Sequence, residues 1–266
     1  KDGERNISET SFQASDKFKS ITSLAGKPKP SAFVTIQEGC DKFCTFCVVP
    51  YTRGKEVSRS QRDILNEIRE SAKKGVKEVI LLGQNVNAYN FEGISFSSLI
   101  YSLAEINEIK RIRFMTSHPR DMTDELITAF GDIPKLMPFL HLPVQSGSNR
   151  ILKSMNRGHI VEEYVEIVNK LRSVRSDICF SSDFIVGYPG ETDKDFQETI
   201  DLCEKVEFAQ AYSFNYSSRP GTPASRKEEL DENLKKTRLH ILQDLLSKQQ
   251  STFLKEQKNT QHKVLF

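Results

Sequence analysis

The sequence predicts an α/β fold, namely a partial barrel of six βα units followed by a C-terminal helix. Two observations lead to this fold class. Short runs of apolar and β-branched residues alternate with helical segments, a pattern typical of a parallel sheet covered by helices. A chain of 266 residues with 37% hydrophobic content is also long enough for one large domain with a sizeable core. Six such units suit an open relative of the eight-unit barrel.

The first unit begins with the strand Phe33-Val34-Thr35-Ile36, continues through a cysteine-containing loop and ends in a helix over 60–74 that Gly75 terminates. Five more strands follow, over residues 77–83, 111–116, 138–142, 178–186 and 209–215. The predicted intervening helices cover residues 97–108, 122–130, 160–174 and 193–206. Thr192 and Asp195 have the spacing of a capping box that opens the last of these helices, so Asp195 and neighbouring Glu191 are expected to be structural.

The two ends differ from the barrel, which we expect to span residues 31–227. Residues 1–30 are polar and end in alternating Pro, Gly and Lys, so we interpret them as a linker from an N-terminal domain. Residues 228–260 form the C-terminal helix, which packs outside the barrel because its larger apolar residues fall near one face. Residues 261–266 are predicted to form one short strand of a further domain.

Composition excludes several function classes. Thirty-eight basic residues nearly balance thirty-six acidic ones, so the net charge of +2 creates no field that demands nucleic acid as a partner. The longest apolar stretches, such as Val79-Ile80-Leu81-Leu82, are too short to cross a bilayer, and no signal peptide opens the chain. Three of the five cysteines lie within eight residues, which indicates a metal site in a reducing compartment. We therefore expect a cytoplasmic protein with no membrane partner.

Polar loops follow all six predicted strands. They are the cysteine loop, residues 83–87, 117–119, 143–148 and 187–191, and residues 217–221. Gly, Pro, Ser and Asn make turns in any protein, so a single such loop carries little information. Strand ends of a barrel lie on one rim, where barrel enzymes build their sites, so six loops predict a shared pocket around the cysteines.

The motif Cys40-x-x-x-Cys44-x-x-Cys47 places three thiolates on one short loop, as in iron–sulfur proteins. A [4Fe-4S] cluster held by three cysteines leaves one iron open, and an open coordination position is typical of catalytic metals. That iron can chelate the amino and carboxylate groups of S-adenosylmethionine (SAM). An electron from the reduced cluster then splits the carbon–sulfur bond of SAM and produces a deoxyadenosyl radical, while the barrel orients both cofactors.

Two other interpretations of this motif are a zinc site completed by a distant histidine and three buried small side chains. Structural zinc sites usually show paired ligands with a second pair at a set distance, and this sequence has no second pair. Cys179 and Cys203 lie in strand and helix patterns and are interpreted as core residues. Asp183 interrupts an apolar strand, so it serves either a ligand, such as a ribose hydroxyl, or a backbone donor.

Five stretches of the sequence point to a particular protein family, and not only to an iron–sulfur site that binds SAM. They are residues 38–54 around the cysteines, 82–87 (LGQNVN), 116–119 (TSHP), 141–148 (HLPVQSGS) and 182–192 (SDFIVGYPGET). With them, the chain from Ser31 to Phe266 closely resembles the radical SAM methylthiotransferases, and within these the branch that modifies isopentenylated adenosine. Residues 48–51 (VVPY) and 83–87 favour this branch.

The resemblance implies an enzyme that adds a methylthio group to carbon 2 of N6-isopentenyladenosine next to the anticodon of tRNA. It implies a monomer that takes electrons from a donor such as flavodoxin or ferredoxin. Cys40, Cys44 and Cys47 match the ligands of the cluster that binds SAM. A further set of residues falls in segments that line the SAM pocket of related barrels: Gln84, Asn85, Gln145, Ser146 and Asp183.

The chain departs from the family in one respect. Members carry an N-terminal domain in which three further cysteines hold an auxiliary [4Fe-4S] cluster, and no cysteine precedes Cys40 here. They also end in a small β-barrel that binds tRNA, of which residues 261–266 would be the first strand. We therefore expect these 266 residues to cleave SAM without completing methylthiolation.

Two alternative functions stay open at this point. One is a sister methylthiotransferase that acts on threonylcarbamoyladenosine in tRNA or on an aspartate of a ribosomal protein. The other is a non-catalytic Fe–S or zinc module that binds RNA, although dense basic and aromatic patches are lacking. Metal content distinguishes the RNA-binding module from the enzyme.

Overall fold

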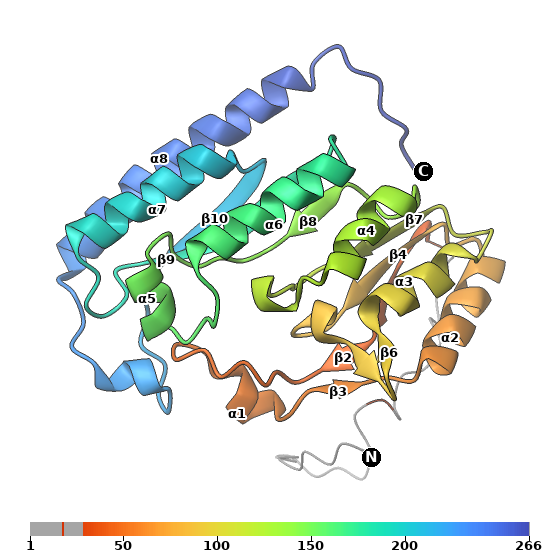
Figure 1. The fold of residues 1–266 in the computed structure, drawn as a ribbon, viewed down its shortest axis with the longest axis horizontal. Helices are drawn as coiled ribbons and strands as arrows, with labels where there is room; N and C mark the ends of the chain where they lie inside the picture. Colours follow the sequence, from red (N-terminus) through yellow and green to blue (C-terminus); the bar gives the residue numbers. More distant parts are fainter. Residues whose placement is uncertain (1–17, 19–28, 266) are drawn as a thin grey trace, which may run out of the picture.

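The computed structural model describes Phe18 and residues 29–265, which form a curved parallel sheet with helices on its outer face (Figure 1). The linker predicted over residues 1–30 lies almost entirely outside the described residues. Its boundary with the barrel therefore stays a prediction.

Six parallel strands build the sheet, and all six predicted strands are confirmed with small differences at their ends. Within the described residues β1 pairs with β4, β4 with β7, β8 with β9, and β9 with β10. A bridge between Ile112 of β7 and Leu136, just ahead of β8, joins the two halves. No ladder joins β1 to β10 in this part of the chain, so the barrel is open. The strands are β1 (Ser31–Thr35), β4 (Glu78–Leu82), β7 (Arg111–Phe114), β8 (Phe139–His141), β9 (Cys179–Val186) and β10 (Gln210–Asn215).

The helices follow the strands, and several of them begin at side-chain caps. Ser60, Thr123 and Thr192 each accept a hydrogen bond from a backbone amide of the first turn, and Asp195 completes the predicted capping box with Thr192. Only the helix predicted over 97–108 ends clearly early, because residues 105–109 form turns. The helices between strands are α2 (Gln61–Lys73), α3 (Phe96–Ala104), α4 (Asp124–Asp132), α6 (Val161–Val174) and α7 (Asp193–Val206).

Several short elements escaped prediction because they are shorter than any hydrophobic period can identify. Two short antiparallel pairs, each made of two-residue strands, lie beside the barrel. They are β2 (Gln37–Glu38) with β3 (Val57–Ser58) and β5 (Asn90–Phe91) with β6 (Ile94–Ser95). Among the other short elements are the helices α1 (Val49–Arg53) and α5 (Asn149–Ser154), and the 3-10 turns η2 (Val86–Ala88), η3 (Pro119–Asp121) and η4 (Pro223–Arg226).

Alternation along each strand separates the core from the inner face of the barrel. In β9, Phe180, Phe184 and Val186 point to the helices and are buried, whereas Asp183 between them is half-buried on the inner face. The same alternation leaves Phe33 of β1 exposed on the inner face. The core therefore lies between sheet and helices, and the concave side stays accessible.

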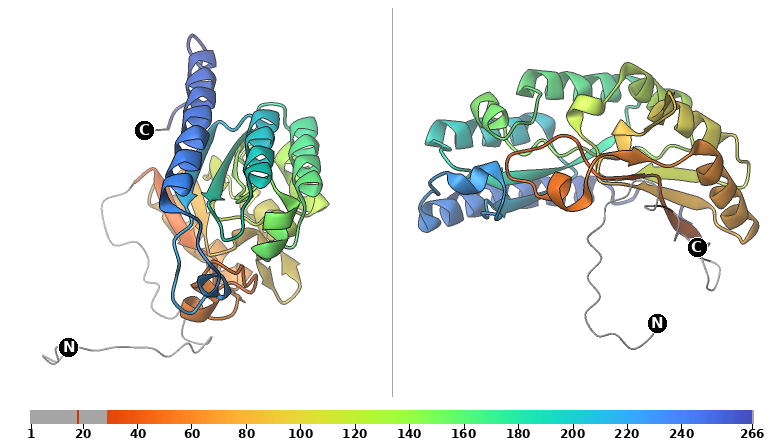
Figure 2. Two further views of the ribbon diagram at one scale, coloured as in Figure 1. Left: turned by 90° about the vertical axis from the view of Figure 1, so that its left-hand side faces the viewer. Right: turned by 90° about the horizontal axis from the view of Figure 1, so that it is seen from below.

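The C-terminal helix α8 (Glu232–Glu256) packs along β10 and α7, as predicted, with Leu242 and Leu246 buried (Figure 2). The strand predicted over 261–266 is wrong for the described residues 261–265, which form no regular structure. A strand requires a neighbouring ladder, and neither the bond from the Arg111 guanidinium to the Lys263 carbonyl nor that between the His262 ring and the Thr260 hydroxyl belongs to one. No described helix combines the length and apolar character needed to cross a membrane.

Candidate functional site

The cysteine loop, residues 39–48, leaves the carboxyl end of the first strand through β2 and leads into α1. In Figure 2 the α1 segment lies on the inner side of the arc of helices. Gly39 opens this loop with φ +80°, and a Cβ there would stand 2.0 Å from the Lys55 carbonyl oxygen. Only glycine fits this position, so the backbone geometry ahead of Cys40 depends on it.

The three thiols are close enough to influence one another electrostatically. Burial raises the pKa of Cys40 to about 11, and the Lys42 amide offsets this only in part. Burial likewise raises the pKa of Cys47, and the neighbouring Cys44 sulfur adds to the effect. At neutral pH these two thiols are therefore protonated unless a metal displaces the protons.

A buried arginine lies against the loop. The Nη1 of Arg157, in the segment after α5, donates a hydrogen bond to the Sγ of Cys44 at 3.4 Å. Its positive charge opposes, without outweighing, the rise that burial causes in the pKa of Cys47. Sequence reasoning missed Arg157 because 113 residues separate it from Cys44 and no local signal links them.

A polar network holds the first part of the loop. Gln84 accepts a hydrogen bond from the Gly39 amide at 2.7 Å, so it bonds the residue next to Cys40. The buried Asn85 donates from Nδ2 to Glu56 at 3.1 Å and to Asp121 at 2.7 Å. Asp121 in turn binds Lys42 of the loop at 2.7 Å. Gln84 and Asn85 thus hold the loop in place through these bonds.

An apolar cluster holds the second part. The Thr45 amide donates to the Met155 carbonyl at 2.9 Å, and its hydroxyl meets the Tyr188 hydroxyl at 2.8 Å. Tyr188 and Met155 are fully buried in a small cluster with Ala224, whose amide binds the Thr45 carbonyl. Loops that follow β8, β9 and β10 therefore meet at the cysteine loop, as the rim argument predicted.

Gln145 and Ser146 differ although they are neighbours. Gln145 adopts φ +80°, a strained conformation for a residue other than glycine, and its backbone bridges the strand β9. Ser146 is buried, and its hydroxyl meets Thr199 of α7 and accepts a bond from the Ser148 amide. The hydroxyl of Ser146 is thus engaged in packing between segments.

Asp183 lies on the inner face of β9, with its side chain 29% exposed. Its Oδ2 lies 3.4 Å from the Nε2 of His141 on β8, and the Nδ1 of His141 meets the Ser181 hydroxyl at 2.8 Å. The carboxylate is therefore oriented by a neighbour but keeps an open side toward the concave surface.

The other two cysteines, Cys179 and Cys203, lie apart from the triad formed by Cys40, Cys44 and Cys47. Cys203 is fully buried in the core, as predicted. The prediction for Cys179 is wrong, because alternation with the buried Ile178 and Phe180 turns its side chain to the inner face, where it is half-buried. Within the described part of the chain no three His, Cys, Asp or Glu side chains converge on a single-ion site. Cysteines of a [4Fe-4S] cluster bind different irons and need no such common point.

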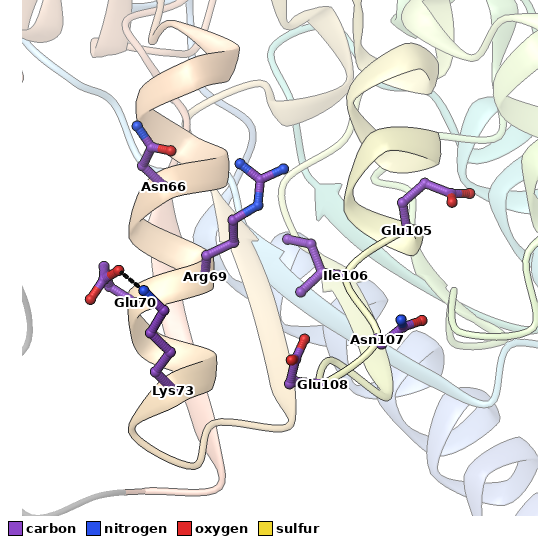
Figure 3. Close-up of a pocket in the computed structure, with 8 residues that line it drawn as sticks. All are labelled: Asn66, Arg69, Glu70, Lys73, Glu105, Ile106, Asn107 and Glu108. Atoms are coloured by element: carbon purple, nitrogen blue, oxygen red, sulfur yellow. Dashed lines mark hydrogen bonds and ion pairs between the residues drawn. The ribbon is translucent and has the colours of Figure 1, made fainter.

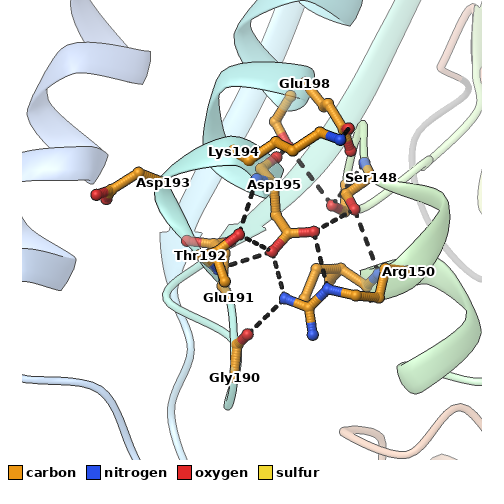
Figure 4. Close-up of polar contacts among 12 residues, drawn as sticks. Ser148, Arg150, Gly190, Glu191, Thr192, Asp193, Lys194, Asp195 and Glu198 are labelled. Atoms are coloured by element: carbon orange, nitrogen blue, oxygen red, sulfur yellow. Dashed lines mark hydrogen bonds and ion pairs between the residues drawn. The ribbon is translucent and has the colours of Figure 1, made fainter.

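Glu191 and Asp195 are structural, as predicted. Glu191 is buried and pairs with Arg238 of α8 at 2.7 Å, which ties the loop after β9 to that helix. Asp195 accepts a hydrogen bond from Ser148 at 2.6 Å and binds the Arg150 guanidinium (Figure 4).

Two surface hollows lie away from the cysteine loop. One of about 470 Å³ separates α2 from the turn after α3 and is lined by charged residues such as Arg69 and Glu108 (Figure 3). The other, of about 460 Å³, lies beside α5 and α7 around Arg150 and Asp195. Neither contains a cysteine or an inner-face residue, so neither supports a site for the predicted chemistry.

The donor set fits a cluster. Three thiols share one loop at the barrel rim, and the Arg157 guanidinium can balance their negative charge once they are deprotonated. Burial keeps the Cys40 and Cys47 thiols protonated at neutral pH, so a bound metal would have to displace their protons. Cys40, Cys44 and Cys47 would hold the irons.

A model of the Radical SAM superfamily matches residues 34–203. The tRNA-2-methylthio-N(6)-dimethylallyladenosine synthase of Maricaulis maris is 56% identical over 255 residues, which cover 92% of this chain and 56% of that protein. The protein of the same name from Rickettsia typhi is 51% identical over 269 residues, covering 99% and 60%. The chain thus spans somewhat more than half the length of these relatives.

Solved structures with low sequence identity share the fold. Coproporphyrinogen III oxidase from Escherichia coli aligns with a TM-score of 0.61 and 19% identity over 84% of this chain and 54% of its own. The radical SAM methyltransferase TsrM from Kitasatospora setae aligns with a TM-score of 0.62 and 15% identity, over 75% and 38%. With the motif, the open barrel and the matched model, this chain belongs to the radical SAM superfamily.

Proposed function

We propose that the chain is the radical SAM core of a tRNA methylthiotransferase that adds a methylthio group to carbon 2 of N6-isopentenyladenosine next to the anticodon. The observation that carries this proposal is the identity of 51–56% to synthases of that name over 92–99% of the chain.

The bound cofactors would supply reductive cleavage of SAM. The protein's own residues position and shield them. Cys40, Cys44 and Cys47 would hold the cluster, and Gln84 keeps Gly39 in the backbone conformation that aims Cys40. Tyr188 and Met155 hold the loop from the other side through Thr45.

The five predicted SAM-binding residues divide into two groups. Asp183 and Gln145 are proposed to touch SAM, because Asp183 faces the concave surface and Gln145 holds a strained backbone beside it. Gln84, Asn85 and Ser146 are proposed to act indirectly, since their polar groups already hold the surrounding loops.

The inner face also suits a planar, partly apolar substrate. Phe33 on one edge strand is 61% exposed, and Tyr212 and Phe214 on the other edge strand are 47% and 54% exposed. Aromatic faces stack on nucleobases, and apolar surface accommodates an isopentenyl chain. An adenosine lifted from a tRNA loop is the proposed occupant.

The partners and setting are part of the same proposal: tRNA as substrate, a flavodoxin or ferredoxin as electron donor, a monomeric state and a cytoplasmic location. An auxiliary [4Fe-4S] cluster would come from cysteines other than these five, since Cys203 is buried in the core and Cys179 lies apart from the triad.

The test is an anaerobic assay of 5′-deoxyadenosine after reconstitution with iron and sulfide, with SAM and dithionite. Wild type should produce it and Cys44→Ala should not. Addition of an isopentenylated anticodon stem-loop should raise the rate, whereas the same stem-loop without the isopentenyl group should not. Equal rates with both RNAs would contradict the substrate proposal while leaving the radical SAM core intact.

A further inference from the structure

Among residues 29–265, buried charges are paired, with one exception. Lys235 binds Glu229, Arg238 binds Glu191, and Glu78 binds Arg113. Asp195 likewise binds the Arg150 guanidinium. Burial of an unpaired charge is costly, so such pairing is the expected arrangement.

Arg157 is the exception among the described residues. Only 5% of it is exposed, and no carboxylate within residues 29–265 forms an ion pair with it. Its Nη2 donates to the Pro143 carbonyl, its Nη1 donates to the Sγ of Cys44, and its Nε has no hydrogen-bond partner. Of these hydrogen-bond partners, the one that can become negative is the Cys44 sulfur, at 3.4 Å.

The aromatic neighbours of Arg157 do not supply a negative charge either. His118 and His159 lie edge to face at 5.7 Å and are both buried. Each has an Nε2 with no partner, and His159 contacts the Arg157 carbonyl through Nδ1. These imidazoles surround the guanidinium without neutralising it.

We propose that Arg157 is the internal counter-ion of the cluster and sets its reduction potential. This inference rests on the proposed function, because it requires the cluster that Cys40, Cys44 and Cys47 would hold. Three thiolates and the cluster carry net negative charge that grows by one unit on reduction, and a fixed buried cation stabilises the more negative state. Arg157 is thus a positioning residue that acts through Cys44.

The test is a redox titration of the reconstituted chain, monitored by electron paramagnetic resonance in the absence of SAM. Arg157→Gln should disfavour reduction by about tenfold, which for a one-electron couple is a midpoint about 59 mV more negative. Arg157→Lys keeps the charge and should stay near the wild-type midpoint. Arg172→Gln is the matched control, because Arg172 is half-buried over Phe180 and bonds a backbone carbonyl without touching sulfur. Its midpoint should not change.

Iron and sulfide content is measured in every sample. A cluster retained by Arg157→Lys and lost in Arg157→Gln would also support the proposal, since charge alone would then decide retention. An unchanged midpoint in Arg157→Gln, or loss of the cluster in both variants, would overturn it. Absence of a four-iron cluster from wild type would instead be a failure of the proposed function.

Discussion

The two halves of the cysteine loop are held by different forces. Toward Gly39 and Lys42 the contacts are polar. Gln84 accepts a hydrogen bond from the Gly39 amide, and Asp121 binds the Lys42 ammonium. Toward Thr45 the loop is hydrogen-bonded to a small buried cluster around Tyr188 and Met155, and the Phe46 side chain packs against that cluster. The polar half is attached to segments that follow β4 and β7, and the apolar half to loops that follow β8, β9 and β10.

This difference has consequences for stability. Hydrogen bonds and ion pairs are directional and each contributes modestly, but a misplaced charge among them is costly. A small apolar cluster is not directional, and it fails when a cavity opens. The stability that the apolar half contributes should therefore change little with salt concentration but fall strongly when a side chain there is shortened. The stability that the polar half contributes should depend on salt concentration and be less sensitive to a loss of side-chain volume.

The largest effect is expected at Tyr188. Tyr188→Ala opens a cavity in the apolar cluster and should lower the free energy of unfolding by about 3–5 kcal/mol. Tyr188→Phe removes only the hydroxyl bonds with Thr45, the Ser154 carbonyl and the Lys227 ammonium, so about 1 kcal/mol is expected. Urea titration followed by circular dichroism measures both. Equal losses would show that the hydroxyl, not the packed ring, holds this half.

Asp195 anchors α5, which carries Ser154 and leads into Met155. Burial alone would raise the pKa of Asp195, but hydrogen bonds from Arg150, Ser148 and Thr192 outweigh it and hold this pKa well below its usual range. The stabilisation is then fully present above the ordinary aspartate pKa of about 3.9 and is lost as pH falls through the lower folded value.

Asp195→Asn should accordingly cost about 2 kcal/mol at pH 7, and its difference from wild type should shrink below about pH 4. Urea titrations across this pH range provide the measurement. Asp201→Asn, which changes an exposed carboxylate on the same helix, is the control and should show a small difference at every pH. A deficit for Asp195→Asn that does not vary with pH would contradict the charge argument.

In the polar half, Asn85→Asp replaces a donor with a third carboxylate beside Glu56 and Asp121. A loss of about 1–2 kcal/mol is expected, and added salt should reduce it because screening weakens the repulsion. Denaturation at low and high salt measures this. The exposed Asn107→Asp adds the same charge elsewhere and should be nearly neutral. Salt independence at Asn85 would mean that lost hydrogen bonds, not repulsion, dominate.

The smallest effect is expected at Lys42, whose partly exposed pair with Asp121 should contribute about 0.5–1 kcal/mol. Lys42→Gln therefore gives a small shift of the urea midpoint that fades as salt increases. Lys73→Gln, in the exposed pair with Glu70, should give no measurable shift. A loss at Lys42 comparable with that of Tyr188→Ala would remove the contrast between the two halves.

Most of the barrel could be predicted because its signals are local. Apolar strands alternate with helices that carry start and stop signals, so each βα unit can be recognised from about thirty consecutive residues. The short elements α1 and α5, and the irregular end at 261–265, could not be predicted, because few residues carry no reliable period and a strand depends on partners that lie elsewhere.

The site was predicted unevenly for the same reason. Spacing alone predicts Cys40, Cys44 and Cys47 as cluster ligands, and the interruption of an apolar strand singles out Asp183; both stay predictions. Asn85 and Ser146 share polar loops with Gln84 and Gln145, and only the fold shows that both are buried in packing contacts. Cys179 was assigned to the wrong face, since alternation does not say which side of a strand faces the core.

The amino-acid sequence by itself determined the order of βα units, the rim on which the loops gather and the three cysteines on one loop, because each depends on residues close together in the chain. The tertiary structure decided that Arg157 meets Cys44 across 113 residues and that Thr45 meets Tyr188. Such contacts depend on the depth and direction of side chains from separate loops, which are settled only when the strands pack side by side.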